Sequence, residues 1–121
     1  MIIKTEYDKT EAYTTKDGSL IRELINPEVH GNCKQSLAEA IIATGCTTLL
    51  HKHHTSEEIY HITAGKGLLT LGNEKVQVEI GDTICIPPGT PHKIQNIGKG
   101  PLRLLCCCSP PYSHNDTELL T

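Results

Sequence analysis

The stretch GCTTLLHKHHTSEEIYHITAGKG, which runs from Gly45 to Gly67, contains four histidines and two adjacent glutamates in a segment of β-strand character. Side chains two positions apart on a strand point to the same face, so His51 and His53 share a face. A second strand that begins near Glu58 would place Glu58 and Tyr60 on one face. If the two strands pair, the carboxylate of Glu58 comes level with the two imidazoles, which predicts a polar site built on strands.

A third imidazole is predicted farther along the chain, in the stretch GDTICIPPGTPHKIQN from Gly81 to Asn96. Its Pro-Pro-Gly turn is rigid and presents His92 at the start of another strand. Three imidazoles and one carboxylate suit one divalent ion of manganese, iron, nickel, cobalt, zinc or copper, and they leave positions open for water or substrate. The spacing alone leaves another interpretation open, because a His-x-His pair on a strand can also be solvated or hydrogen-bonded without an ion.

Together these two stretches resemble the two sequence motifs of the cupin superfamily. The first motif is a glycine, five residues, His-x-His, three or four residues, a glutamate, six residues and a glycine, and it matches Gly45, His51, His53, Glu58 and Gly65. The second is a glycine, five residues, Pro-x-Gly, two residues, a histidine, three residues and an asparagine, and it matches Gly81, Pro87, Gly89, His92 and Asn96. The fifteen residues between the motifs resemble the spacer of small microbial one-domain cupins.

The resemblance implies both a fold and a set of metal ligands. Cupins are all-β proteins whose double-stranded β-helix, or jelly-roll barrel, holds a metal ion near one mouth. The ligands that the resemblance implies are His51, His53, Glu58 and His92. Glu57 competes with Glu58, because it fits the three-residue form of the first motif. We prefer Glu58, since six residues separate it from Gly65 and it lies on the face of Tyr60.

Glycine and proline punctuate short apolar or β-branched runs at intervals typical of an all-β sandwich or barrel. The expected strands span residues 20–25, 35–42, 47–53, 58–64, 67–71, 74–79, 83–86, 92–96 and 102–108. The segment 36–43 is ambiguous, because Ser-x-x-Glu followed by good helix formers is the spacing of a helix capping box. We expect a strand there, since its neighbours are strands.

The length of 121 residues predicts one cupin domain over 1–121, with a core barrel at about 20–108, an N-terminal arm at 1–19 and a C-terminal tail at 109–121. A net charge of −3 with scattered basic residues argues against a nucleic-acid partner. No stretch resembles a signal peptide or a membrane span, so we expect a cytoplasmic protein without a membrane partner. The six cysteines are then expected to be reduced thiols.

Three residues are candidates for contact with a small-molecule ligand. The Tyr60 hydroxyl can donate to a bound ligand or can be satisfied within the core. Cys106 and Cys108 share a face on the last strand, opposite Cys107, and that face is the interior if Arg103 points to solvent. We expect at least one of the two inner thiols to line the cavity, and the alternative for each is simple packing.

The outside of the barrel and the tail suggest contacts beyond the core. Ile59 and Leu50 fall on the outer faces of their strands, and outward apolar residues are easier to explain as buried in a partner. The resemblance likewise implies that two barrels pair, so we expect a homodimer. The tail at 110–117 is too polar for the core and is expected to lie across its own barrel or a partner's.

Two functions of different class follow from these patterns. The first is a metal-dependent enzyme of dioxygenase, decarboxylase, lyase or isomerase type that acts on a small organic molecule. The second is a non-catalytic cupin that binds a small molecule or a metal. The complete four-ligand set favours an enzyme, whereas the lack of an assignable general base favours a binding protein. Thiol dioxygenases generally lack the motif glutamate, so Glu58 counts against that branch, and the lack of Phe and Trp counts against a phosphate-bearing sugar.

Overall fold

The computed structural model describes residues 1–120, and it is almost entirely β-structure. Short helical turns interrupt the strands near both ends of the chain. The elements in chain order are η1 (Tyr7–Lys9), β1 (Ala12–Thr14), β2 (Leu20–Ile25), α1 (Pro27–His30), β3 (Ser36–Ile42), β4 (His51–His53), β5 (Glu57–Ala64), β6 (Lys66–Leu71), β7 (Glu74–Glu79), β8 (Thr83–Ile86), β9 (His92–Asn96), β10 (Leu102–Ser109), η2 (His114–Asp116) and β11 (Thr117–Leu119).

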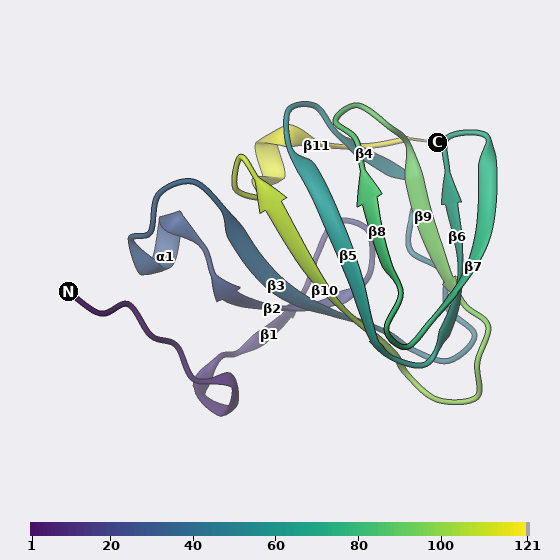
Figure 1. Cartoon of the computed structure of the whole chain (residues 1–121), viewed down its shortest axis with the longest axis horizontal. Helices are drawn as coiled ribbons and strands as arrows, with labels where there is room; N and C mark the ends of the chain where they lie inside the picture. The colour runs from purple at the N-terminus through teal and green to yellow at the C-terminus, as the bar shows by residue number, and fades with distance from the viewer. Residues whose placement is uncertain (121) are drawn as a thin grey trace.

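Two antiparallel sheets face each other and form the barrel (Figure 1). The six-stranded sheet has the order β1-β2-β3-β10-β5-β8, and the five-stranded sheet has the order β11-β4-β9-β6-β7. Strands that are far apart in the sequence therefore lie side by side, as β3, β10 and β5 do. This arrangement is the jelly-roll barrel that the resemblance implied.

Strand alternation fills the space between the sheets with apolar side chains. Ile62, Leu69 and Leu102 have no exposed surface, and burying a side chain of this size contributes about 2 kcal/mol to stability. The pairing of β10 with β5 sets Leu104 opposite Ile62 on the inner face. Farther along the same pair, the inner face becomes polar, and this change from apolar to polar positions the candidate site inside the barrel.

The nine expected strands are confirmed, and most of their ends agree to within one residue. The ambiguous segment 36–43 forms the strand β3, not a helix. The strand expected at 47–53 is shorter than predicted and begins at His51. The reason is that the backbone amides of Thr48 and Leu49 donate to two different partners, Ile94 O and Asp17 O, at 3.0 and 2.7 Å.

A pair of tight contacts closes the end of the barrel opposite the site. Gly65 has a φ of +85°, and a Cβ there would lie 2.7 Å from the carbonyl oxygen of Pro101. The buried amide of Asn96 donates to the carbonyls of Ile42 and Gly100, both at 2.9 Å. In this chain, these contacts are made by the last residue of each cupin motif.

The C-terminal tail lies across its own barrel, which is one of the two arrangements expected. The strand β11 pairs with β4, so the tail becomes the edge of the five-stranded sheet. The Asp116 carboxylate accepts hydrogen bonds from the backbone amides of Thr55 and Ser56, and the Lys16 ammonium donates to the carbonyls of His114 and Thr117. The tail is thus held at both ends of its last turn.

Among residues 1–120, no helix combines the length and the hydropathy needed to cross a membrane.

Candidate metal centre

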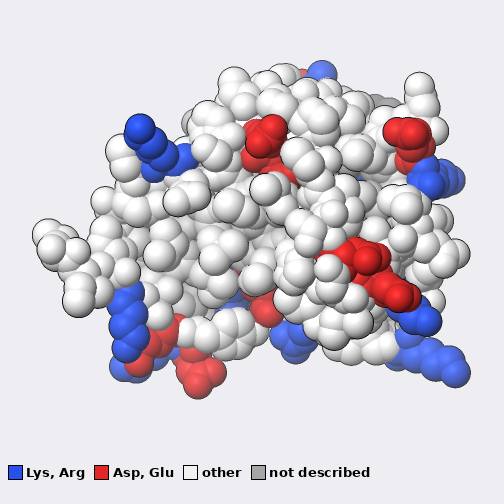
Figure 2. All heavy atoms as spheres, in the orientation of Figure 1, with Lys and Arg blue, Asp and Glu red and all other residues white. Residues whose placement is uncertain are grey.

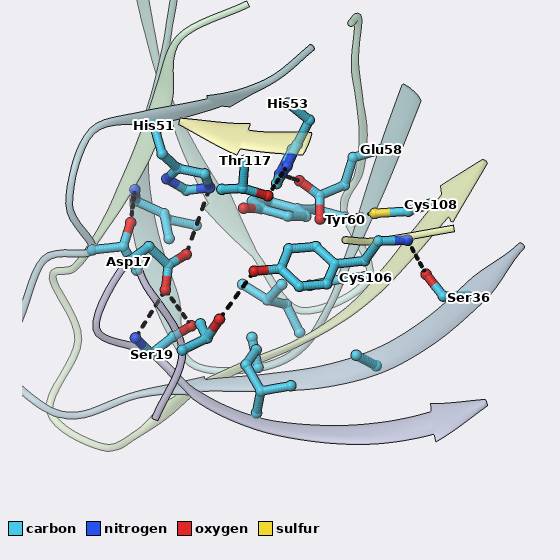
Figure 3. Close-up of a pocket in the computed structure, with 18 of the residues that line it drawn as sticks. Asp17, Ser19, Ser36, His51, His53, Glu58, Tyr60, Cys106, Cys108 and Thr117 are labelled. Carbon is cyan, nitrogen blue, oxygen red and sulfur yellow. Dashed lines mark hydrogen bonds and ion pairs between the residues drawn. The ribbon is translucent and has the colours of Figure 1, made fainter. Parts of the chain in front are cut away.

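Three histidines meet inside the barrel, and Figure 3 shows two of them, His51 and His53, beside Glu58. His51 and His53 come from β4, and His92 comes from β9, where it pairs directly with His51. The three can offer ring nitrogens that all lie within 4.8 Å of one another. Glu58 approaches them from β5 in the opposite sheet, and all four side chains are buried. The face assignment made from the sequence therefore brings the expected residues together.

Two of the histidines have their tautomer fixed by the backbone. The Nδ1 atom of His51 lies 2.8 Å from the carbonyl oxygen of Leu49, and that of His92 lies 2.9 Å from the carbonyl oxygen of Thr90. A carbonyl oxygen can only accept a hydrogen bond, so each Nδ1 carries the proton. In the neutral imidazoles the Nε2 lone pair then faces the centre, which is the arrangement of a metal-ligating histidine.

The third histidine is fixed by the C-terminal tail. The Nδ1 atom of His53 lies 2.9 Å from the hydroxyl of Thr117, and this hydroxyl donates its only hydrogen to the carbonyl of Ser113 at 2.9 Å. Thr117 must therefore accept from His53, whose Nδ1 carries the proton. No sequence pattern predicts this role, because Thr117 is distant in the chain and lies in a segment without periodicity.

The atoms that face the centre have no hydrogen-bond partner. His53 Nε2, His92 Nε2 and Glu58 Oε1 are buried and unpaired in the described chain, although Oε1 lies 3.2 and 3.3 Å from the two nitrogens. If both imidazoles are neutral, these contacts place the lone pairs of the two Nε2 atoms against another acceptor, Glu58 Oε1. Such atoms are stable in a buried site when protons or a cation lie among them, and the donor set fits a divalent transition-metal ion.

The second oxygen of Glu58 is held by a thiol. The Cys108 Sγ–H group donates to Glu58 Oε2 at 3.3 Å, and the two residues are direct partners across β10 and β5. Burial by itself opposes ionisation of Glu58, but His53 and His92 in their protonated forms would outweigh it and lower the pKa to about 2. Burial and the neighbouring His92 lower the pKa of His51, which favours its neutral form.

A cavity opens beside His51, His53 and Glu58. Tyr60, Cys106 and Cys108 all line it, as the strand alternation predicted. Burial and the Glu58 carboxylate raise the pKa values of Tyr60 and Cys106 well above their usual ranges, so both groups stay protonated as donors. A protonated thiol is a poor nucleophile, and neither cysteine has the thiolate character expected of a reactive residue.

Sequence reasoning missed Asp17, because no motif surrounds it. The loop between β1 and β2 carries this carboxylate into the cavity, where Oδ2 lies 3.6 Å from Nε2 of His51 (Figure 3). Its Oδ1 accepts from the amide and the hydroxyl of Ser19 at 2.9 and 2.6 Å. Glu58 thus approaches two of the imidazoles, and Asp17 approaches the third.

The remaining histidines of the central stretch and the competing glutamate point away from the centre. His54 contacts Glu118 at 3.0 Å on the surface, and His61 contacts the hydroxyl of Thr83 at 2.8 Å on the outer face. Glu57 is exposed, whereas Glu58 keeps only 4% of its surface accessible. This contrast follows from the period of two along β5.

Known proteins resemble this chain in sequence. An uncharacterized protein of Methanocaldococcus jannaschii is 66% identical over 119 residues, which cover 98% of this chain and 95% of that protein. The tetracenomycin polyketide synthase protein TcmJ of Streptomyces glaucescens is 26% identical over 108 residues, covering 85% of this chain and 72% of TcmJ.

Solved structures share the fold at low sequence identity. The polyketide cyclase RemF of Streptomyces resistomycificus has a TM-score of 0.82 at 20% identity, covering 100% of this chain and 87% of RemF. The nucleoside dehydratase Pac13 has a TM-score of 0.80 at 16% identity, covering 99% of this chain and 92% of Pac13. Oxalate decarboxylase of Lactobacillus farciminis, in complex with formate, has a TM-score of 0.82 at 24% identity, and the match covers 93% of this chain but 34% of the decarboxylase.

A family model described as "Cupin domain" matches residues 38–108, which is more than half of the chain and includes both histidine motifs. The chain belongs to the cupin family.

Proposed function

We propose that this cupin is a metal-dependent enzyme acting on a small organic molecule. His51, His53, Glu58 and His92 would hold one divalent transition-metal ion, such as manganese or iron. When bound, the ion would act as a Lewis acid or a redox centre. The dioxygenase, decarboxylase, lyase and isomerase types all remain compatible with this donor set.

The observation that carries the proposal is the orientation of the buried donors. Every Nδ1 atom in the set is engaged with an oxygen that must accept its proton, and the Nε2 atoms of His53 and His92 face Glu58 Oε1 without a partner. A purely structural polar cluster would satisfy its buried atoms internally. Leaving them unpaired costs stability, which a bound ion would restore.

The cavity residues supply the rest of the site. Tyr60 would donate a hydrogen bond to the ligand, and Cys106 would contact it from the opposite strand. The solved cupin structures that resemble this chain include a decarboxylase, a cyclase and a dehydratase, which supports chemistry on a small molecule in general. Asp17 adds a carboxylate that the sequence had not offered, and this favours an enzyme over a non-catalytic binding protein.

Element analysis of the protein purified from its own source, followed by a substrate screen with that metal restored, tests the proposal. We expect about one transition-metal ion per chain and turnover of at least one small organic compound. A stoichiometric metal without turnover would favour the non-catalytic alternative. Purified protein without bound metal, and without affinity for any of the candidate ions, would refute both.

A separate prediction concerns the two inner thiols. We expect Cys106→Ser and Cys108→Ser to change metal affinity, metal preference or turnover while the fold stays intact. Cys108→Ser keeps a donor to Glu58 but shortens its reach, and Cys106→Ser replaces a soft atom in the cavity. Cys107→Ser, on the outer face, is the matched control. If both inner variants bind metal like the parent and lose only stability, the thiols are packing residues.

We also propose that two copies of the chain pair through the outer face of the six-stranded sheet. Leu37, Cys107, Ile59 and Cys85 lie in register across β3, β10, β5 and β8 and form an apolar row. Leu37 and Ile59 are 36% and 40% exposed. Figure 2 shows that few charged side chains cover this part of the surface. An apolar row across a sheet suits a second copy of itself.

Substitution of Ile59 tests the pairing. We expect the parent to be a dimer by light scattering at micromolar concentration and Ile59→Asp to be a monomer, because the substitution buries a charge in the interface. Val76→Asp is the matched control, since Val76 is a 51% exposed apolar residue on the other sheet. A monomeric parent, or a dimer that Ile59→Asp leaves intact, would count against this interface.

A further inference from the structure

The cavity beside the candidate metal centre is lined by carboxylates, and its lining includes no Lys or Arg among the residues described. We propose that this cavity binds an uncharged or cationic organic molecule that presents O–H or N–H donors, and that Asp17 and Glu23 exclude anions. The inference rests on the metal-dependent function proposed above and specifies its ligand class.

The charges of the lining support this ligand class. With a divalent ion in place, the three carboxylates of Asp17, Glu23 and Glu58 outweigh its two positive charges, and the histidine ligands are neutral. A carboxylate or phosphate group entering the cavity would therefore meet net negative charge in surroundings of low dielectric constant. A neutral molecule meets no such barrier, and a cation is attracted.

Free hydrogen-bonding atoms point to a ligand that donates. Oδ1 of Asp17 is occupied by Ser19, and no described donor reaches Oδ2, which faces the centre. Oε1 of Glu23 accepts from the hydroxyl of Tyr13 at 2.8 Å, whereas Oε2 is buried without a partner.

Most hydroxyls of the lining are already used within the protein. The hydroxyl of Tyr112 lies 3.1 Å from that of Thr15 and 3.0 Å from His114 Nδ1. Ser36 accepts from the backbone amide of Tyr112 at 2.8 Å. Tyr60 has no such partner within the described chain, and the hydroxyls of Ser36 and Thr48 are recorded only as acceptors, so all three can still donate. The ligand would thus meet these hydroxyls and the two carboxylate acceptors of Asp17 and Glu23.

The hollow next to the cavity is also acidic. A second hollow, lined by Tyr13, Glu23, Asn26, Glu28, Val29, Tyr112, Ser113 and His114, adjoins the cavity. It shares Tyr13, Glu23 and Tyr112 with the inner cavity, so these three side chains form the partition between the two. Its charged side chains of fixed sign are the carboxylates Glu23 and Glu28, and its described lining has no Lys or Arg. An anion in this hollow would therefore meet negative charge as well.

A series of probes of equal size and different charge tests the inference. The cobalt-loaded protein is titrated with oxalate, oxamate and oxamide, which carry two, one and no negative charges, and the visible cobalt absorption reports binding. We expect Asp17→Asn combined with Glu23→Gln to raise the affinity for oxalate at least about tenfold. The gain for oxamate should be smaller, and the affinity for oxamide should change less than about twofold.

The control is Glu57→Gln combined with Glu74→Gln, which removes the same charge from exposed positions, and it should leave oxalate affinity unchanged. The single variants Asp17→Asn and Glu23→Gln should each raise the affinity for oxalate at least about threefold. They test the inference even if the double variant does not fold. Normal cobalt binding with unchanged oxalate affinity in these variants would overturn the inference alone. A parent protein that does not bind cobalt would overturn the metal-dependent function and this inference with it.

Discussion

The variant that combines His51→Ala and His53→Ala is expected to lose its metal entirely on dialysis. Two of the four proposed donors disappear, and the remaining two, Glu58 and His92, come from opposite sheets and cannot by themselves enclose an ion. We expect the metal content to fall from about one ion per chain to less than about a tenth. Element analysis after dialysis against metal-free buffer measures this directly.

Loss of metal has to be separated from loss of fold. The matched control combines His54→Ala and His61→Ala. These two imidazoles belong to the same stretch of sequence as His51 and His53 but lie outside the centre. It should retain the parent's metal content, as should Glu57→Ala. Circular dichroism should show the same β-structure in all variants. Unchanged metal content in the variant without His51 and His53 would contradict the proposed site.

Substitution of Gly65 by alanine should cause the largest loss of stability of any single methyl group added to this chain. The backbone of Gly65 has a φ of +85°, and the new Cβ would lie 2.7 Å from Pro101 O and 2.9 Å from Leu102 Cα. Both obstacles are backbone atoms of the neighbouring segment, so neither can move aside without shifting β10. We expect the free energy of unfolding to fall by at least about 3 kcal/mol.

Gly45→Ala separates the clash from the backbone strain. Gly45 has a φ of +78°, but no atom lies within 4 Å of the position that its Cβ would take. Its substitution should cost only the left-handed strain, about 1 kcal/mol. Urea denaturation of both variants measures the difference. Equal destabilisation by the two substitutions would show that the contact between Gly65 and Pro101 is not tight in solution.

The sequence by itself determined most of the strands and the face on which each motif residue lies. The period of two along β5 separates buried Glu58 from exposed Glu57, and the same period on β10 sends Cys106 and Cys108 inward. These properties are local, because the pleat of a strand fixes the direction of each side chain relative to its neighbours. Through the resemblance to cupins, the spacing of the motifs then placed four of these side chains in one expected site.

Only the tertiary structure decided which residues surround that site. Asp17 enters the cavity from a turn, and Thr117 reaches His53 from the tail, although neither segment has a pattern that predicts its position. Loops and short edge strands are placed by packing and by hydrogen bonds to distant backbone groups, such as that from Leu49 to the carbonyl of Asp17. Strand periodicity carries no information about such contacts. The imidazole tautomers and the acidic character of the cavity therefore emerged only when the chain had folded.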